Sequence, residues 1–514
     1  MKKYLLLTIA VLTVLLCTSC MEELGTYNYV ETNEIKIDSI KGQSITQYDT
    51  LRIVPTITQS KNVSEENLEY LWYWYKAGAG ENAKIDTLGF DRNLKYYVAA
   101  GPGLYNARLK ITDKETGLFA RKEFDITVDA ENSGLLILSD LDGNANLSLL
   151  NSSKIFSQNI YYAANGEYAG THPIGIADID NAATDLHMIV ILCADGKGGV
   201  VTEPTSFVKI SDYSSLFYVM PSPIAPEAYC AVATLYNTGM GITYDFIINN
   251  GKLHYRDFQY ASYEPLFNPE VSGDYSLAPY AILNNNTLLF YDNKNYHFNI
   301  LKCSYGQLKE TKLDPVPLPE GTDTDALAFD PRNVGLELVY AAKGWKKMDN
   351  DAGYAYGIFR KPGTTDLANM YCLRFNIGYS MSMGGDYFTP YFQHTVSGAT
   401  DLDKATAFAM SREDPYLYYA YKNKIYSYDL EFDKGKVIYD TDTVVGPGAK
   451  VDYLYFRPDN ESFNMWAATS VEGSSERTGS IHVLGLGRNG DVIKVDTVYR
   501  NVCGKVVGMT FKNR

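Results

Sequence analysis

Three histidines stand in matching surroundings and are of the residue type that ligates metal ions. His254, His297 and His482 each follow a turn closely and lie between two apolar residues. Imidazole nitrogens bind zinc and other transition metals, so these positions raise the hypothesis of a metal ring. Equivalent positions of different repeats lie far apart unless they face a common axis. Other polar residues fill the same position elsewhere, namely Ser148, Lys209, Arg374 and Ser427. We therefore expect a solvated polar position, with no metal and no cofactor.

Acidic residues cluster at three places where carboxylates could bind calcium: Asp140, Asp142 and Asn144; Asp323 and Asp325; Asp349 and Asp351. The first cluster begins like an EF-hand loop. It has Ala145 where that loop needs glycine and Asn151 where it needs glutamate. We expect these residues to form turns, as Asp and Asn commonly do.

Motifs for catalysis are scarce. The chain has no Gly-x-Ser-x-Gly, no His-Glu-x-x-His and no phosphate-binding loop. Acidic residues are abundant, so a two-carboxylate glycosidase stays open, but no pair of carboxylates stands out. We expect a binding protein rather than an enzyme.

Two aromatic insertions, residues 343–357 and 378–394, are the strongest candidates for a ligand site. Loops on a rigid scaffold often carry function, and aromatic surface with a few polar groups is typical of ligand sites. The predicted ligand-binding residues are Trp345, Tyr354, Tyr356, Tyr379, Tyr387, Phe388 and Tyr391. The alternative is that both insertions only pack over the domain beneath them.

The first residues resemble the signal peptide of a bacterial lipoprotein. Lys2 and Lys3 precede an apolar run at residues 5–16, which is shorter than the about 20 residues that span a bilayer. The sequence Cys17-Thr18-Ser19-Cys20 follows and resembles a lipobox. We predict a signal peptide at 1–19, lipidation of Cys20 and an anchoring linker at 20–33. The acidic residues just after Cys20 resemble an export signal to the outer face of the outer membrane.

The bulk composition narrows the class of partner. A formal net charge of −15 argues against nucleic acid, whose phosphates require a basic surface. Of the seven cysteines, five lie beyond the signal region, without metal-binding spacing: Cys193, Cys230, Cys303, Cys372 and Cys503. Their disulfide state stays open. The 43 tyrosines favour strands and amphipathic surfaces.

Residues 34–129 predict a small β-sandwich. Residues 68–75 alternate aromatic side chains between two faces, and residues 105–113 alternate at period two, with turn residues after them. We expect Trp72 and Trp74 to be core residues. The Tyr-x-Ala-x-Leu-x-Ile-Thr-Asp stretch at 105–113, with the Trp-bearing strand, resembles PKD-like, immunoglobulin-type domains. The acidic, glycine-rich loop usual after that Trp is replaced by Lys76-Ala77-Gly78-Ala79-Gly80.

Residues 130–514 contain weak internal repeats. Residues 291–300 match 421–430, and residues 325–333 match 452–460. An apolar–polar–apolar triplet after a turn occurs seven times, centred on the seven positions compared above. The first and last triplets are 334 residues apart, which gives about 56 residues per interval. Because a propeller blade needs roughly 40–50 residues, we predict an all-β chain whose sandwich precedes a β-propeller of seven blades, with six or eight as alternatives. Residues 505–511 are expected to close the ring by pairing near residues 135–138.

The whole arrangement resembles PKD-like family lipoproteins of Bacteroidetes. That resemblance implies a surface-exposed, lipid-anchored outer-membrane protein associated with a TonB-dependent uptake system. We therefore expect it to bind a polymeric nutrient, a glycan or a peptide. The alternatives are a propeller glycan lyase or hydrolase, and an adhesive or structural surface protein.

Overall fold

The structure is a computed structural model of the chain. It describes residues 32–512, apart from residues 47–48, 62–63, 79–83, 99, 130–132, 152–153, 182–185, 233–243, 258–265, 285–286, 305–306, 309–311, 345–353, 381–384 and 458–462. The predicted signal peptide and Cys20 lie outside the described residues. The elements are nearly all strands, and the described α-helices are two short ones, α2 (Ile160–Asn165) and α3 (Asp442–Val445). Within the described residues, no helix has the length and hydropathy needed to cross a membrane.

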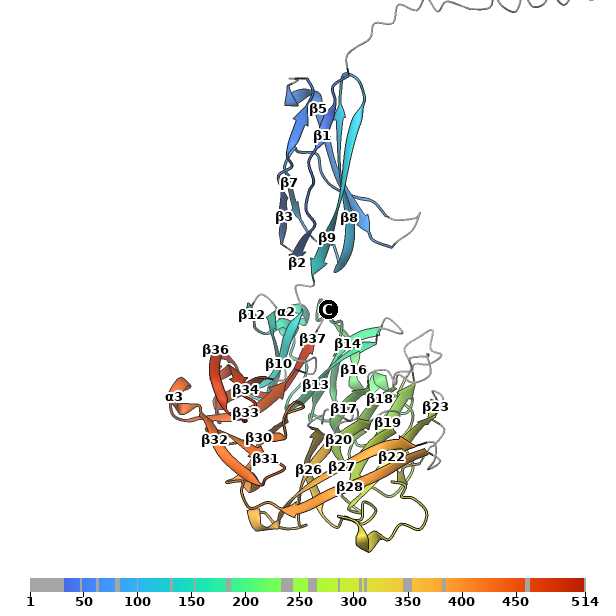
Figure 1. Cartoon of the computed structure of the whole chain (residues 1–514), viewed down its shortest axis with the longest axis vertical. Helices are drawn as coiled ribbons and strands as arrows, with labels where there is room; N and C mark the ends of the chain where they lie inside the picture. The colour runs from blue at the N-terminus through green and yellow to red at the C-terminus, as the bar shows by residue number, and fades with distance from the viewer. Residues whose placement is uncertain are drawn as a thin grey trace, which may run out of the picture. The chain divides into compact units, whose positions relative to one another are not determined.

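The chain divides into two compact units, Met1–Asp129 and Ala130–Arg514 (Figure 1). Unit 1 has a five-stranded sheet in the order β2-β9-β8-β5-β6, and two-stranded sheets β1-β4 and β3-β7. Its elements are β1 (Ile35–Ile37), β2 (Gln43–Thr46), β3 (Thr50–Ile53), β4 (Ile57–Gln59), the 3₁₀ turn η1 (Glu65–Asn67), β5 (Leu68–Lys76), β6 (Asp86–Gly89), β7 (Leu94–Tyr97), β8 (Gly103–Asp113) and β9 (Phe119–Asp129).

The alternation of side chains along β5 and β8 builds the core of unit 1. Trp72 and Trp74 are fully buried, as predicted. The Trp72 indole N–H donates to the Asp91 carbonyl at 2.8 Å. Trp74 stacks on Tyr105, with ring centroids 4.5 Å apart. Because each indole has its own packing partner inside the sheet layers, these rings stabilise the fold and do not contact a ligand.

Unit 2 is a β-propeller. Its described residues form seven antiparallel sheets, which we number along the chain. From the inside outward, sheet 1 contains β37 (Lys505–Lys512), β10 (Gly134–Leu141), β11 (Asn144–Asn151) and β12 (Phe156–Ser157); sheet 2 contains β13 (Pro173–Asn181), β14 (Leu186–Cys193), β15 (Gly199–Thr202) and β16 (Lys209–Asp212); sheet 3 contains β17 (Pro226–Val232), β18 (Tyr244–Asn249) and β19 (Lys252–Asp257). Sheet 4 contains β20 (Leu277–Asn284), β21 (Thr287–Asp292) and β22 (His297–Ser304), with β23 (Gln307–Leu308) and β24 (Asp314–Pro315) both pairing with β22.

The remaining sheets have four strands each. Sheet 5 contains β25 (Glu337–Lys343), β26 (Ala355–Arg360), β27 (Met370–Ser380) and β28 (Gly385–Thr395); sheet 6 contains β29 (Ala407–Met410), β30 (Tyr416–Tyr421), β31 (Lys424–Asp429) and β32 (Lys434–Asp440); sheet 7 contains β33 (Ala449–Phe456), β34 (Asn464–Val471), β35 (Gly479–Leu486) and β36 (Val492–Cys503). Short 3₁₀ turns η3 (Tyr213–Leu216), η4 (Thr324–Ala326), η5 (Leu367–Asn369) and η7 (Leu402–Lys404) lie in the connections.

The first strand of each sheet faces the centre of the ring. Strands β37, β13, β17, β20, β25, β29 and β33 contact one another in that order, and β33 contacts β37 again. The last strand of the chain completes the first sheet, since Leu135 pairs with Phe511 and Leu138 with Gly508. The predicted closure of the ring is therefore confirmed.

The repeats found in the sequence correspond to real positions in the sheets. Six of the seven apolar–polar–apolar triplets lie in third strands, counted from the centre: in β11, β19, β22, β27, β31 and β35. The exception, around Lys209, enters the outer strand β16. Residues 291–300 and 421–430 both span the turn between second and third strands. Residues 325–333 and 452–460 are not equivalent, because 452–456 belongs to inner strand β33 while 325–333 precedes β25.

The expectation that the polar triplet position is solvated is wrong at four of the seven positions, while Lys209, His297 and Arg374 are partly exposed. Ser148, His254, Ser427 and His482 are each at most 3% exposed. The physical reason is that both faces of a propeller sheet pack against neighbouring sheets. The alternation of side chains along a strand therefore does not separate a buried face from a solvent-exposed face. Some of these polar side chains bond internally, whereas His254 Nε2 and Ser427 Oγ are buried without a hydrogen-bond partner among the described residues. The two ring nitrogens of His482 lie 3.1 Å from the Tyr439 hydroxyl and 3.2 Å from that of Thr469.

Candidate functional site

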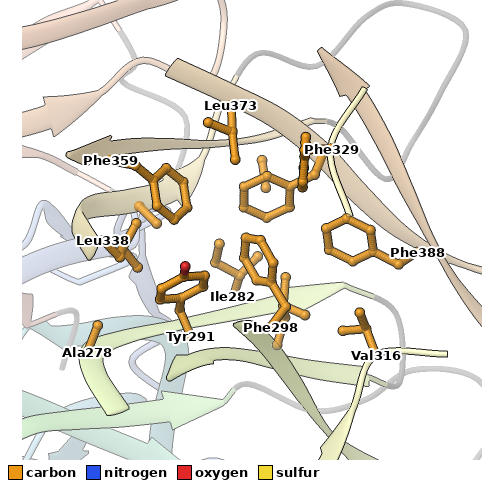
Figure 2. Packing of buried hydrophobic residues seen from close by; sticks show 14 of the residues in the cluster. Ala278, Ile282, Tyr291, Phe298, Val316, Phe329, Leu338, Phe359, Leu373 and Phe388 are labelled. Atoms are coloured by element: carbon orange, nitrogen blue, oxygen red, sulfur yellow. The ribbon is translucent and has the colours of Figure 1, made fainter. Parts of the chain in front are cut away.

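The seven residues predicted to bind a ligand have different positions in the structure. Trp345 lies outside the described residues, as do the side chains of Tyr379 and Tyr387, whose backbones belong to β27 and β28. Tyr356 and Phe388 are core residues, 0% and 3% exposed. In Figure 2, Phe388 lies beside Phe298, and the two ring centroids are 5.1 Å apart. Tyr356 and Phe388 are thus buried away from any ligand, and we remove them from the candidate site.

The remaining two residues, Tyr354 and Tyr391, are brought together around an arginine. Their rings meet edge to face at 4.9 Å. The Arg374 guanidinium lies 4.7 Å from the centroid of Tyr354, 5.3 Å from that of Tyr391 and 4.6 Å from that of Phe392. Such contacts stabilise a cation over aromatic rings. Tyr391 is 37% exposed, so the edge of this aromatic group reaches the surface of sheet 5.

The same arginine ties sheet 5 to sheet 6. Its Nη1 donates to Glu431 Oε2 at 2.5 Å, and the Tyr356 hydroxyl donates to Glu431 Oε1 at 2.7 Å. Glu431 lies in the turn after β31, so these bonds join neighbouring sheets. Arg374 is already bonded to a carboxylate and covered by rings, which indicates a structural role for this group of residues.

Both predicted insertions start at the same end of sheet 5. One connects β25 to β26 and the other connects β27 to β28. Successive strands are antiparallel, so the first and third connections of a four-stranded sheet emerge on one side. Both connections therefore leave sheet 5 on one side, but most of the predicted second insertion is strand, because residues 378–380 belong to β27 and residues 385–394 belong to β28.

A cavity of about 510 Å³, which we call the aromatic mouth, opens beside the first insertion. Its wall is formed by the last residues of inner strands β25, β29 and β33, so it lies at one end of the central ring. Half-buried aromatic rings dominate this wall: Tyr340, Phe408, Tyr453, Tyr455 and Phe456. Its volume is in the range of about 300–1,000 Å³ that is common for small-ligand sites.

Ring contacts fix the geometry of the aromatic mouth. Tyr340 and Phe408 stack with centroids 5.2 Å apart and planes 16° apart. Tyr280 meets Tyr340 edge to face at 5.5 Å, and its hydroxyl donates to the Val339 carbonyl at 3.1 Å. Burial raises the pKa of Tyr280 to about 12, with a smaller effect of the nearby Tyr453. Tyr340 of sheet 5 and Tyr453 of sheet 7 therefore line the cavity, and Tyr280 of sheet 4 packs against Tyr340.

Charged side chains surround the rings of the aromatic mouth. Lys343, Arg412, Glu413 and Arg457 all line the cavity, and Arg412 and Glu413 are exposed. Flat rings beside charged donors and acceptors suit a ligand with apolar faces and hydroxyl edges. Sequence reasoning missed this cavity because its walls come from strands far apart in the chain. The available signal was the aromatic run at Tyr453, Tyr455 and Phe456.

Calcium binding finds no support in the clusters that the structure describes. Asp140 Oδ1 accepts from the Gly143 amide at 2.8 Å, and Asp323 Oδ1 accepts from the Asp325 amide at 3.1 Å. Both are turn-forming bonds. Asp349 and Asp351 lie outside the described residues. No group of three metal-binding side chains occurs among the residues described.

The cysteines that the structure describes are free thiols. They are Cys193, Cys230, Cys372 and Cys503, and the side chain of Cys303 is not described. Burial raises the pKa of Cys193 to about 12 and that of Cys503 to about 12. Buried thiols with such high pKa values behave as small apolar residues and not as nucleophiles.

The fold defines a β-propeller protein in which a PKD-like module precedes the propeller in the sequence. The family model described as the PKD-like family matches residues 20–173, which include all of that module and the first strands of unit 2. No curated protein matches.

Several solved structures are distantly similar. A quinonprotein alcohol dehydrogenase-like protein of Bacteroides thetaiotaomicron is 12% identical, with 90% of this chain and 96% of that chain covered and a TM-score of 0.39. Apo AztD from Citrobacter koseri is 9% identical, with 86% and 97% covered and a TM-score of 0.32. The β-propeller domain of Nup133 from Vanderwaltozyma polyspora is 9% identical, with 53% and 74% covered and a TM-score of 0.30.

Proposed function

We propose that this protein is a lipid-anchored, surface-exposed binding protein that captures a glycan at the aromatic mouth. The observation that carries the proposal is the cavity of about 510 Å³ walled by aromatic rings, with Arg412 and Glu413 at its edge. Sugar rings have apolar C–H faces that pack on aromatic rings and hydroxyls that bond to charged side chains. A peptide would use the same rings less completely, because it offers fewer hydroxyl groups to the charged edge.

A glycan and peptide array tests the ligand class. Phe408→Ala removes one of the two stacked rings, and we expect it to weaken binding of the selected glycan about three- to tenfold, as loss of one aromatic contact does. The matched control is Phe432→Ala, because Phe432 is 72% exposed in the turn between β31 and β32 and does not line the cavity. Trp345→Ala tests whether the neighbouring insertion contributes. Equal binding by the wild type and Phe408→Ala would refute the site, and selection of peptides alone would refute the glycan assignment.

The anchor is the second part of the proposal. The Cys17-Thr18-Ser19-Cys20 sequence and the apolar run before it support a lipidated Cys20 on the outer membrane. Replacing Cys20 by Ser in the producing bacterium should abolish incorporation of radiolabelled fatty acid and release the protein from the membrane fraction. Retention of both by the variant would contradict the anchor.

The third part is the partner. The resemblance to PKD-like lipoproteins supports an accessory role beside a TonB-dependent importer. Chemical crosslinking on whole cells, followed by purification of the tagged protein, should recover an outer-membrane channel. Recovery of the protein alone at several crosslinker lengths would contradict a stable complex.

A further inference from the structure

Three neighbouring inner strands each bring an aromatic ring and a cation to the aromatic mouth. The pairs are Tyr340 with Lys343 in β25, Phe408 in β29 with Arg412 just after it, and Tyr453 in β33 with Arg457 just after it. In each pair the cation follows the ring by three or four residues, toward the end of the strand at which the cavity lies. The aromatic wall therefore carries positive charge from all three sheets that form it.

Positive charge outnumbers negative charge at the aromatic mouth. Its described lining residues include these three cations and one carboxylate, that of Glu413. The tyrosine rings add no negative charge, because burial raises the pKa of Tyr340 and that of Tyr453. The whole chain, by contrast, has a formal net charge of −15. A cavity lined by excess positive charge is thus unusual on the surface of this acidic protein.

The other end of the central ring has the opposite charge. A second cavity, of about 590 Å³, is bounded there by the first residues of β33 and β37 and by Thr406 just before β29. Its charged lining residues are five carboxylates, Asp140, Asp142, Asp452, Glu472 and Glu476, and three lysines, Lys422, Lys450 and Lys505. An anionic polymer is therefore attracted to the aromatic mouth and repelled from the opposite end of the ring.

The cations at the aromatic mouth are close enough to a bound ligand to outweigh the distant carboxylates. At physiological salt the screening length is about 8 Å, so charges farther away contribute little. Arg412 is exposed, and Lys343 and Arg457 are half-buried. The guanidinium carbon of Arg457 lies 3.4 Å from the centroid of the Phe511 ring, which holds this planar group in place. A guanidinium that is already oriented loses little freedom when it binds the oxygens of an anion.

We propose that the glycan bound at the aromatic mouth is acidic, with carboxylate or sulfate groups on its sugar rings. The C–H faces of the sugar pack on Tyr340 and Phe408, and the anionic groups bind the guanidinium groups of Arg412 and Arg457. This inference rests on the proposed function, because it specifies the glycan that the same site takes.

Calorimetry on the full protein compares anionic polymers with their neutral forms. Polygalacturonate, alginate and hyaluronan are each paired with the carboxyl-reduced polymer, and dextran sulfate is paired with dextran. We expect at least one anionic polymer to bind about tenfold or more tightly than its neutral form, and to lose about fivefold or more of its affinity from about 50 mM to about 500 mM sodium chloride. The pair with the largest ratio distinguishes carboxylate from sulfate. Polyglutamate, which is anionic but has no sugar rings, should bind at least about tenfold more weakly.

Two adjacent residues of opposite charge test the role of charge directly. Arg412→Gln removes a cation from the cavity and Glu413→Gln removes the carboxylate, and both side chains are exposed. The readout is the affinity for the preferred anionic polymer divided by that for its neutral form. Arg412→Gln should lower this ratio about two- to fivefold, and Glu413→Gln should raise it by a similar factor. Lys434→Gln is the matched control, because Lys434 is exposed on the outer strand β32 and does not line the cavity.

The outcomes separate this inference from the proposed function. Equal affinity for every anionic polymer and its neutral form would overturn the acidic class, as would failure of all the anionic polymers to bind. A ratio that is unchanged in both variants, or lowered in both, would also overturn it. If Phe408→Ala weakens a neutral glycan that the wild type prefers, the proposed function stands and the acidic class fails. If Phe408→Ala leaves the binding of every glycan unchanged, the proposed function fails as well.

Discussion

Closure of the propeller can be tested at one glycine. Gly504 directly precedes β37, and its amide donates to Ser139 Oγ at 3.3 Å. A Cβ atom at position 504 would lie 2.1 Å from the Asp140 carbonyl oxygen, whereas real Cβ atoms essentially never come closer than 3.0 Å to another heavy atom. The obstacle is backbone and cannot rotate away. Gly504→Ala must therefore push the start of β37 away from β10 by nearly one ångström.

The size of the effect follows from that displacement. Overpacking of this kind costs about 1–3 kcal/mol, and loss of the Ser139 hydrogen bond adds about 1 kcal/mol. We expect the pairing of β37 with β10 to weaken by about 2–4 kcal/mol. Because hydrogen exchange reports local opening, amides of these two strands should exchange about 30-fold faster or more, as measured by mass spectrometry on peptides from both strands.

The control is a glycine in the neighbouring inner strand. In Gly175→Ala the nearest heavy atom is Leu192 Cδ1 at 3.9 Å, which is an ordinary contact, so exchange should match the wild type. If Gly504→Ala left the exchange of β10 and β37 unchanged, the argument that β37 closes the ring against a rigid β10 would be wrong.

Three further predictions concern buried groups. Burial and, to a smaller extent, Arg500 lower the pKa of His482 from 6.5 to about 4, so the unfolded chain takes up a proton first as pH falls. Stability should drop by about 3 kcal/mol between pH 6.5 and pH 4, and His482→Gln should lose that part of the slope in urea unfolding at a series of pH values. Arg256 and Asp245 form a fully buried ion pair at 2.8 Å, so Arg256→Met should destabilise the protein by about 3–5 kcal/mol in the same assay, and a change below 1 kcal/mol would contradict this. Cys372 and Cys503 are buried thiols that should resist iodoacetamide in the native protein and react after unfolding, as mapped by mass spectrometry.

Much of the fold was predictable because local patterns determine it. The alternation in residues 68–75 placed Trp72 and Trp74 in a core, and the apolar tail after Gly504 predicted the closing strand. Turns such as the one at Asn250, with a φ of 51°, and Gly251, with a φ of 68°, follow from residues that tolerate the left-handed region. These signals depend only on neighbouring residues, so the sequence displays them directly.

The wrong predictions concern residues whose burial depends on packing between neighbouring sheets and not on the pattern within one strand. Tyr356 and Phe388 look like surface aromatics at the ends of insertions, but stacking of neighbouring sheets covers them. The triplet position of His254 and Ser427 looked solvated for the same reason. The wall of the aromatic mouth joins residues from three sheets, namely Tyr340, Phe408 and Tyr453, and no local pattern reveals which sheets become neighbours.

The antiparallel pairing of β10 with β37 has a practical consequence for the design of labelled variants. Gly134, near the start of unit 2, is opposite Lys512, near the end of the chain. The start of β10 and the end of β37 therefore lie side by side at the same end of one sheet. A fluorophore on the turn that carries Phe432 belongs to a different sheet, so it leaves the pairing of β10 with β37 undisturbed.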